Sequence, residues 1–375
     1  MTDEPGIRVG SVDCLIAWGW DAGHAETFTP HASAGLEPGR IVIEDRGSYL
    51  VRTAAGEVRA TVSGHYRHEA ATDRTMIFPA VGDWVALQGT PDADHRIVRG
   101  VLPRRTAIVR RAPTDHGTPE QVLGANIDAV LVMTSLDHDL NLRRLERYLT
   151  LAWGSGARPV VVLSKADLAP DHDAAVAGVA VVAGGAPIHV VSSVTGVGLD
   201  DLRARLAPGR TLAIIGSSGV GKSTFVNALA GQPLETTGEI RADDGRGRHT
   251  TSRRHLVLLP GGGLVLDTPG MRELGLVEAD AGLDETFEDI DALATECRFA
   301  DCLHETEPGC AVRAAVGDGR LDPGRLASRQ KLDRELDRME RGRDPRARAE
   351  DRRKWRLMHQ ASARQTRPKH GQDRP

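Results

Sequence analysis

Residues 216–223 read Gly-Ser-Ser-Gly-Val-Gly-Lys-Ser, between an apolar segment at 212–215 and a predicted helix at 224–229. A strand that enters such a loop and a helix that leaves it are typical of a phosphate-binding loop. Glycines let the backbone curl around an anion, so that backbone N–H groups and the helix N-terminus face the phosphates. The alternative is a glycine-rich turn without a ligand. We expect nucleotide contacts from Gly216, Ser217, Ser218, Gly219, Val220, Gly221, Lys222, Ser223 and Thr224.

Base recognition is predicted at two segments that precede this loop in the chain. Ser164, Lys165 and Asp167 follow one apolar strand, and Ser192 and Ser193 follow another. The Asp167 carboxylate would accept hydrogen bonds from the N1 and N2 donors of guanine, where adenine presents an acceptor. The aliphatic stem of Lys165 would lie across the base, and the backbone N–H of Ser193 would reach guanine O6. Each short motif occurs often by chance, but together they favour GTP over ATP.

Residues that sense the γ-phosphate are expected after the phosphate loop. Asp267 closes a predicted strand, and Gly270 follows it with an N–H for the γ-phosphate. Residues 247–251 read Gly-Arg-His-Thr-Thr; a solvated basic loop is the alternative interpretation of this stretch. The expected Mg²⁺ ligands, some of them acting through water, are Ser223, Thr250, Thr251 and Asp267.

The residue that promotes hydrolysis is harder to identify. Many GTPases place Gln after the glycine of this motif to orient water, but here Met271 occupies that position. Lys222 supplies positive charge at the β- and γ-phosphates and is one catalytic candidate. His249 is the other, because imidazole can orient or deprotonate water near neutral pH. An ordinary surface histidine is the alternative for His249.

Hydrophobic patterning predicts a multidomain protein. Residues 1–34 show no clear periodicity and are expected to form a partly ordered arm. Residues 35–111 contain short β-rich segments separated by Gly, Asp and Pro turns, without an intervening amphipathic helix, which predicts an OB-type barrel; a generic β domain is the alternative. Residues 112–276 alternate strands and helices around a mostly parallel α/β sheet and include a hairpin at 255–266. The last region, 277–375, is expected to be small and mainly helical.

A metal site is predicted in this last region. Three cysteines and one histidine follow the spacing Cys297-x4-Cys302-x-His304-x5-Cys310. Three thiolates and an imidazole complete a tetrahedral shell for one structural Zn²⁺ and leave no open position for catalysis. Unliganded buried cysteines with an incidental histidine are the alternative. Cys14 stands apart and is expected to be an ordinary thiol.

Composition and charge restrict the cellular context. Four cysteines in 375 residues argue against a disulfide scaffold, and the apolar runs are too short to cross a membrane. With no recognisable secretion signal at the N-terminus, we expect a cytoplasmic, monomeric protein. Twelve Lys or Arg but only four Asp or Glu lie at 341–375, where residues 352–356 place Trp355 inside a basic run. That run predicts RNA contact, although a solvated helix with a buried Trp is an equal alternative.

The order of the nucleotide motifs carries a resemblance. A typical GTPase begins with the phosphate loop and ends with the base-reading motifs, whereas here the base-reading motifs come first. Together with residues 247–251, residues 267–273 and the cysteine spacing, this order resembles the RsgA family of circularly permuted, small-ribosomal-subunit-dependent GTPases. The resemblance covers residues 35 to about 360. Ser164 departs from it, because the family commonly has Asn or Thr there, and residues before 35 have no match.

The resemblance implies an OB domain, a permuted GTPase core and a C-terminal zinc domain whose ligands match the three cysteines and His304. It further implies GTP hydrolysis to GDP and phosphate, stimulated by the small ribosomal subunit and its rRNA late in assembly. A GTP-sensing RNA-binding scaffold with incidental hydrolysis is the alternative from another class. A third alternative is a P-loop ATPase or kinase. The presence of Asp167, whose carboxylate suits guanine, argues against it.

Overall fold

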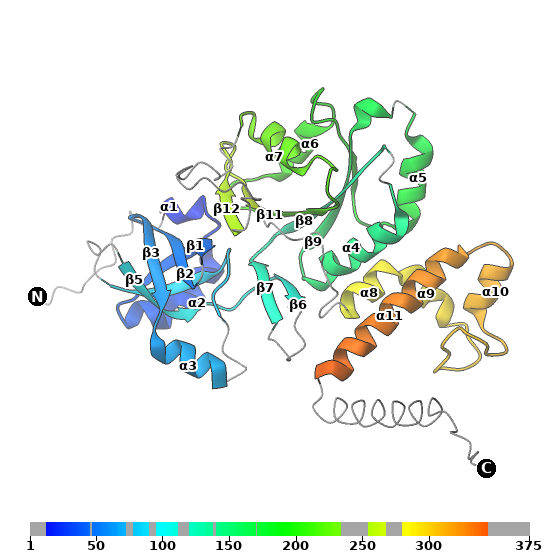
Figure 1. The fold of residues 1–375 in the computed structure, drawn as a ribbon, viewed down its shortest axis with the longest axis horizontal. Coiled ribbons are helices and arrows are strands. Elements are labelled where there is room, and N and C mark those ends of the chain that lie inside the picture. Colours follow the sequence, from blue (N-terminus) through cyan, green and yellow to red (C-terminus); the bar gives the residue numbers. More distant parts are fainter. Residues whose placement is uncertain are drawn as a thin grey trace, which may run out of the picture.

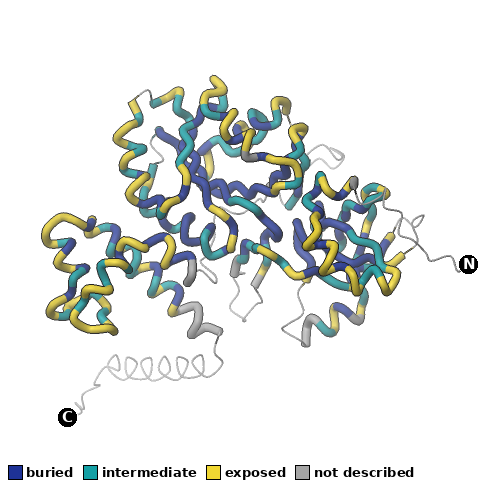
Figure 2. Tube along the Cα trace, turned by 180° about the vertical axis from the view of Figure 1, so that it is seen from behind, coloured by how far each residue is buried: buried dark blue, intermediate teal, exposed yellow. Residues whose placement is uncertain are grey.

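A computed structural model describes residues 13–45, 47–72, 78–89, 95–111, 120–137, 140–169, 171–233, 254–267 and 280–343. These residues form an N-terminal barrel, a central α/β core and a C-terminal group of helices, arranged in a row (Figure 1). Buried segments run through the barrel and the core sheet, whereas much of the helical group is exposed (Figure 2). No described helix is long and apolar enough to cross a membrane.

Five strands close the barrel in the order β1-β2-β3-β5-β4-β1. The pairing of β3 with β5 is parallel, and the other pairings are antiparallel. This topology confirms the predicted OB-type barrel. The strands are β1 (Glu37–Asp45), β2 (Ser48–Thr53), β3 (Gly56–Val62), β4 (Trp84–Gln88) and β5 (His95–Val101).

Two features of this region were not predicted from the sequence. A helix, α3 (Gly64–Thr72), lies between β3 and β4; its nine residues bury Tyr66 but form no apolar stripe, so no helical period was visible. The described part of the expected N-terminal arm is also well packed, as α1 (Asp13–Ile16) and α2 (Ala22–Ser33). Trp20 is buried with its ring centroid 4.8 Å from that of Trp84, so aromatic contacts attach this segment to the barrel.

The central core is a sheet with the strand order β10-β9-β8-β11-β13-β12. The first five strands run parallel, and β12 pairs antiparallel with β13, as the predicted hairpin requires. The bounds are β8 (Ala129–Ser135), β9 (Arg158–Ser164), β10 (Ile188–Val190), β11 (Thr211–Gly216), β12 (Arg254–Leu258) and β13 (Leu264–Asp267).

Helices cover both faces of this sheet. Along β11, Ala213 and Ile215 join the core that contains α4 (Leu142–Gly154) and α5 (Asp173–Val182). Leu212 and Ile214 join the core that contains α6 (Leu199–Arg205) and α7 (Lys222–Ala230). Alternate side chains of one strand therefore enter two hydrophobic cores, which explains why the strand reads as a continuous apolar run.

The barrel and the core are parts of one continuous sheet, because β1 pairs antiparallel with β12. The chain passes between them through a separate hairpin, β6 (Ala107–Arg111) and β7 (Glu120–Ala125). The predicted domain limit between residues 111 and 112 falls inside this hairpin. Because the N–H of Ala107 donates to the carbonyl oxygen of Ser155 at the end of α4, we propose to count the hairpin with the core.

Arg40 of β1 joins the N-terminal segment, the barrel and the core. Its guanidinium is fully buried and donates to the carbonyl oxygens of Trp18, Gly82 (3.2 Å) and Asn126 (3.1 Å), and to Thr211 Oγ1 (2.9 Å). Burial lowers the pKa of Arg40 to about 10. These acceptors come from the N-terminal segment, the barrel and the core, so one side chain fixes their mutual position.

The helices of the C-terminal region pack on α4 and on one another. They are α8 (Asp280–Thr286), α9 (Glu288–Ala294), α10 (Ala311–Gly317) and α11 (Pro323–Arg343). At Gly282 of α8, an added Cβ would lie 2.1 Å from the carbonyl oxygen of Thr150, so only glycine allows this approach. Buried Arg325 of α11 donates to Glu146 of α4 (3.0 Å) and, through two nitrogens, to Asp289 of α9. Leu332 and Leu336 of α11 are both buried, and the mainly helical character predicted for this region is present in its described part.

Replacing Arg40 by Met should lower the free energy of unfolding by about 3 kcal/mol, because buried carbonyl oxygens of Trp18 and Asn126 would lose their donor. Urea unfolding followed by tryptophan fluorescence would measure the change. Arg59→Met is the matched control, since Arg59 lies exposed on β3. Equal stability of the Arg40→Met variant and the wild type would contradict the role assigned to Arg40.

Candidate functional site

The carboxyl ends of the parallel strands meet at one edge of the core sheet. Ser135, Ser164 and Gly216 end β8, β9 and β11, and the register pairs Ser135 with Ser164 and Gly216 with Met133. Asp267 ends β13, beside β11. Ligands of open α/β sheets bind at this edge. The fold therefore brings the predicted phosphate and base segments together, although they lie far apart in the chain.

The phosphate loop connects β11 to α7. Gly216 has φ of 156°, and a Cβ there would lie 2.3 Å from the carbonyl oxygen of Met133, so the loop starts with a glycine for steric reasons. Lys222 is the first residue of α7, and its Nζ donates to the carbonyl oxygens of Gly216 (2.7 Å) and Ser217 (2.6 Å). These bonds fold the lysine back over the loop, so that its ammonium lies among the backbone groups that would surround an anion. Ser223 and Thr224 follow it and are exposed.

Ser164 links the base segment to the phosphate loop. Its buried Oγ donates to the carbonyl oxygen of Val220 at 2.8 Å; a second acceptor, the carbonyl oxygen of Thr134, lies farther away at 3.2 Å. A hydroxyl has one proton, so the shorter bond to the loop is favoured. Ser164 thus makes a side-chain tether to the phosphate loop.

Asp167 and Ser192 meet although they follow different strands. Ser192 Oγ donates to Asp167 Oδ1 at 2.6 Å and accepts the N–H of Thr195 at 3.1 Å. Ser192 is buried, whereas Asp167 is exposed. This bond orients the carboxylate and leaves its second oxygen for other donors. Ser193 follows in the same loop, half-buried.

Several predicted residues lie outside the described part of the chain. They are His249, Thr250 and Thr251 of the γ-phosphate segment, Gly270, Met271, and the basic run at 352–356. For Asp267 the structure gives the backbone: it closes β13 and pairs with His255 of β12.

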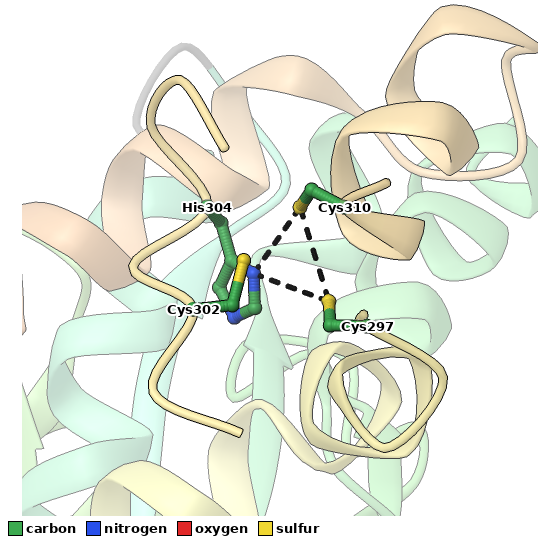
Figure 3. A group of neighbouring side chains, drawn as sticks. All are labelled: Cys297, Cys302, His304 and Cys310. Carbon is green, nitrogen blue, oxygen red and sulfur yellow. Dashed lines mark hydrogen bonds between the residues drawn. The ribbon is translucent and has the colours of Figure 1, made fainter. Parts of the chain in front are cut away.

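Cys297, Cys302, His304 and Cys310 converge at a second site. Figure 3 shows the four side chains pointing toward one another from the end of α9, the following loop and the start of α10. One ligand atom from each lies within 4.8 Å of the others. His304 Nδ1 lies 3.6 Å from Cys297 Sγ and 3.4 Å from Cys310 Sγ, and those two sulfurs are 3.9 Å apart. Tetrahedral Zn–S bonds require about 3.8 Å between sulfurs, so the donor set fits zinc.

The carboxylate of Glu307 holds the loop that carries His304, because it accepts hydrogen bonds from backbone N–H groups of that loop. Glu307 accepts the N–H groups of Leu303 (3.0 Å), Glu305 (2.9 Å) and Thr306 (3.0 Å). The backbone N–H of Glu307 itself, followed by that of Leu303 and others in the loop, lowers the pKa of the Glu307 carboxyl to about 2. The N–H of Arg313 donates to Cys310 Sγ at 3.4 Å, which caps α10 and orients the sulfur. Glu307 was not predicted from the sequence. The feature that could have indicated it is its place between two candidate ligands, His304 and Cys310.

Comparison with known proteins gives relatives over nearly the whole chain. The family model described as RsgA GTPase matches residues 101–277. The small ribosomal subunit biogenesis GTPase RsgA of Opitutus terrae is 46% identical over 355 residues, which cover 92% of this chain and 96% of that protein. The protein of the same name from Streptomyces coelicolor is 46% identical over 344 residues, with 91% and 92% covered.

Solved structures agree with the sequence relatives. The crystal structure of YjeQ from Thermotoga maritima superposes with a TM-score of 0.58 at 25% identity and covers 80% of this chain and 98% of that one. YloQ, described as a circularly permuted GTPase, gives a TM-score of 0.56 at 25% identity, with 83% and 96% covered. Since relatives at 46% identity cover about nine-tenths of it, the chain belongs to the RsgA family of circularly permuted GTPases.

Proposed function

We propose that this GTPase binds the small ribosomal subunit and acts late in its maturation, with hydrolysis of GTP to GDP and phosphate stimulated by the subunit. The observation that carries the proposal is 46% identity, over about nine-tenths of both chains, to proteins named small ribosomal subunit biogenesis GTPase RsgA. The barrel and the C-terminal helices flank the GTPase core on either side (Figure 1), which gives an RNA partner two modules to contact.

GTP is assigned to the strand-end edge of the core. The phosphate loop, residues 216–224, holds the phosphates, and Lys222 neutralises charge that develops at the β- and γ-phosphates during hydrolysis. Asp167, oriented by Ser192, reads the N1 and N2 donors of guanine, while Ser193 reads O6. Mg²⁺ accompanies GTP and is assigned to Ser223, Thr250, Thr251 and Asp267, with the N–H of Gly270 on the γ-phosphate. His249 is our candidate for orienting the attacking water.

One Zn²⁺ is assigned to Cys297, Cys302, His304 and Cys310. Four protein donors complete its shell, so the ion is structural and takes no part in hydrolysis. The loop between α9 and α10 buries little apolar surface, so zinc binding contributes directly to its folding.

The other expected contacts concern RNA and location. We propose that the barrel and the basic C-terminal segment contact rRNA, and that the protein acts as a cytoplasmic monomer. Phosphate contacts release counterions, so binding to the subunit should weaken steeply with salt.

The permuted order places the zinc region, residues 277–375, almost directly after the strand that ends at Asp267. We propose that GTP and its Mg²⁺ order the segment after β13 and thereby set the position of the zinc region for subunit binding, which hydrolysis reverses. The zinc region also contacts the nucleotide-binding core at a second place, where α8 packs closely on α4, so a change at the nucleotide acts on that region through both connections.

The proposed activity predicts that purified small subunits raise the rate of GTP hydrolysis by the wild type at least tenfold. Lys222→Ala should abolish both basal and stimulated hydrolysis, because the ammonium at the phosphates is lost. Phosphate release measured with and without subunits tests this. Tight binding to subunits without any stimulation would instead indicate the scaffold alternative.

Nucleotide-dependent binding is a separate expectation. Subunits should bind the form loaded with a non-hydrolysable GTP analogue about tenfold or more tightly than the GDP form, in a sedimentation assay at fixed salt. A subunit that bound the GTP-analogue form and the GDP form equally well would favour neither form. Equal affinities would therefore refute the proposed switch.

Zinc removal should unfold the C-terminal helices locally. We expect one zinc per chain by elemental analysis and, after chelation or in Cys302→Ser, lost amide-exchange protection in α9 and α10 with GDP binding retained. Cys14→Ser is the matched control, because Cys14 is exposed and lies outside the cluster. Unchanged protection in the chelated protein would rule out a structural ion.

A further inference from the structure

A carboxylate that the nucleotide motifs do not include lies beside the proposed guanine pocket. β8 and β9 pair in parallel as far as Ser135 and Ser164, and the N–H of Leu136 donates to the carbonyl oxygen of Ser164 at 2.9 Å. The two strands therefore end side by side. Asp137, two residues after β8, and Lys165, the residue after β9, project from the same short stretch of the sheet edge.

Asp137 and Lys165 form an ion pair there. Lys165 Nζ lies 2.7 Å from Asp137 Oδ2, and the two side chains are 30% and 26% exposed. The other oxygen, Asp137 Oδ1, accepts from Ser135 Oγ at 2.6 Å, and Ser135 is fully buried. The carboxylate is thus held from the protein side by a rigid hydroxyl and presents its second oxygen to the lysine.

The backbone fixes the other end of the Lys165 side chain. Lys165 has φ of 60°, a left-handed conformation that is uncommon for a non-glycine residue. The following residue, Ala166, donates its N–H to the carbonyl oxygen of Val191 at 3.1 Å, and the 3₁₀ turn Ala166–Leu168 carries Asp167. With the Cα position and the ammonium both held, the four-carbon stem between them has few orientations left.

We propose that Asp137 is a positioning residue for guanine binding: it holds the ammonium of Lys165 so that the aliphatic stem lies ready against the base. This inference rests on the proposed guanine pocket. A lysine stem held only at its Cα must lose rotamer freedom when the nucleotide binds, whereas one already held by Asp137 has lost that freedom beforehand. The ion pair therefore contributes to nucleotide affinity without touching the nucleotide.

The test uses the full-length protein and GDP affinity measured by calorimetry or fluorescence. Asp137→Ala should weaken GDP binding by roughly three- to tenfold, the range for a partly exposed, charge-assisted pair. Asp137→Asn should bind within about twofold of the wild type, because its amide oxygen still accepts from Lys165 and its NH₂ still faces the Ser135 hydroxyl.

A double-mutant cycle separates positioning from a general structural effect. Lys165→Met keeps an apolar stem but has no ammonium for Asp137 to hold. In that background Asp137→Ala should have no further effect on GDP affinity. Loss of affinity to the same extent in both backgrounds, or no loss in the wild-type background, overturns the proposal. Asp200→Ala is the matched control, because Asp200 pairs with Arg203 on the surface of α6 and should leave binding unchanged.

Two further measurements distinguish failure of this inference from failure of the guanine pocket itself. Wild type should prefer GDP to ADP by a large factor, and Asp167→Ala should remove that preference. If neither holds, the pocket is wrong and the role of Asp137 is overturned with it. If both hold while Asp137→Ala binds GDP like the wild type, only the role of Asp137 is overturned.

Discussion

The alignment of parallel strands at one sheet edge is the constraint on which the nucleotide site depends. Each strand of the core ends within a residue or two of its neighbour, so a side chain just past one strand reaches the loop of the next. The bond from Ser164 Oγ to the carbonyl oxygen of Val220 makes this alignment specific, since it joins the base segment to the phosphate loop across the sheet. The order of the motifs in the chain is immaterial once that register is set.

The barrel is an extension of the same sheet. β12, which precedes β13 in the core, pairs with β1 of the barrel, and Arg254 at its start lies 3.0 Å from Glu44 of β1. Arg40 reinforces the junction from inside, with acceptors on three separate parts of the chain. A displacement of β12 would therefore move the barrel as well, because hydrogen-bonded strands and a buried guanidinium do not slide independently.

On the side of the core away from the barrel, α4 links the strand-end edge of the sheet to the C-terminal helices. Its start follows the loop that contains Asp137, and its outer face carries Glu146, which meets Arg325 of α11. Arg147, the next residue of the same helix, pairs with Glu335. The predicted nucleotide site and the helices around the candidate zinc cluster thus share one rigid element, in addition to the covalent connection after β13.

Local patterns determined much of this protein from sequence alone. The strand, turn and helix at residues 212–229, the hairpin at 255–266 and the alternation of parallel strands with helices all follow from short-range periodicity and turn residues, and the structure contains each of them. The four candidate metal ligands were recognisable because they lie within fourteen residues, so their spacing is itself the signal. The N-terminal helices and α3 were missed, because their few buried aromatics leave no regular apolar stripe.

Only the tertiary structure decided which distant side chains act together. Nothing near Ser164 in the sequence indicates that its hydroxyl reaches Val220, fifty-six positions away, or that Asp137 meets Lys165. In the sequence Arg40 is one more residue of a strand. Only the structure shows that its guanidinium donates to four acceptors from separate segments. Secondary structure and short motifs depend on interactions between near neighbours, which the sequence displays directly, whereas these contacts depend on strand register and packing, which exist only after the chain has folded.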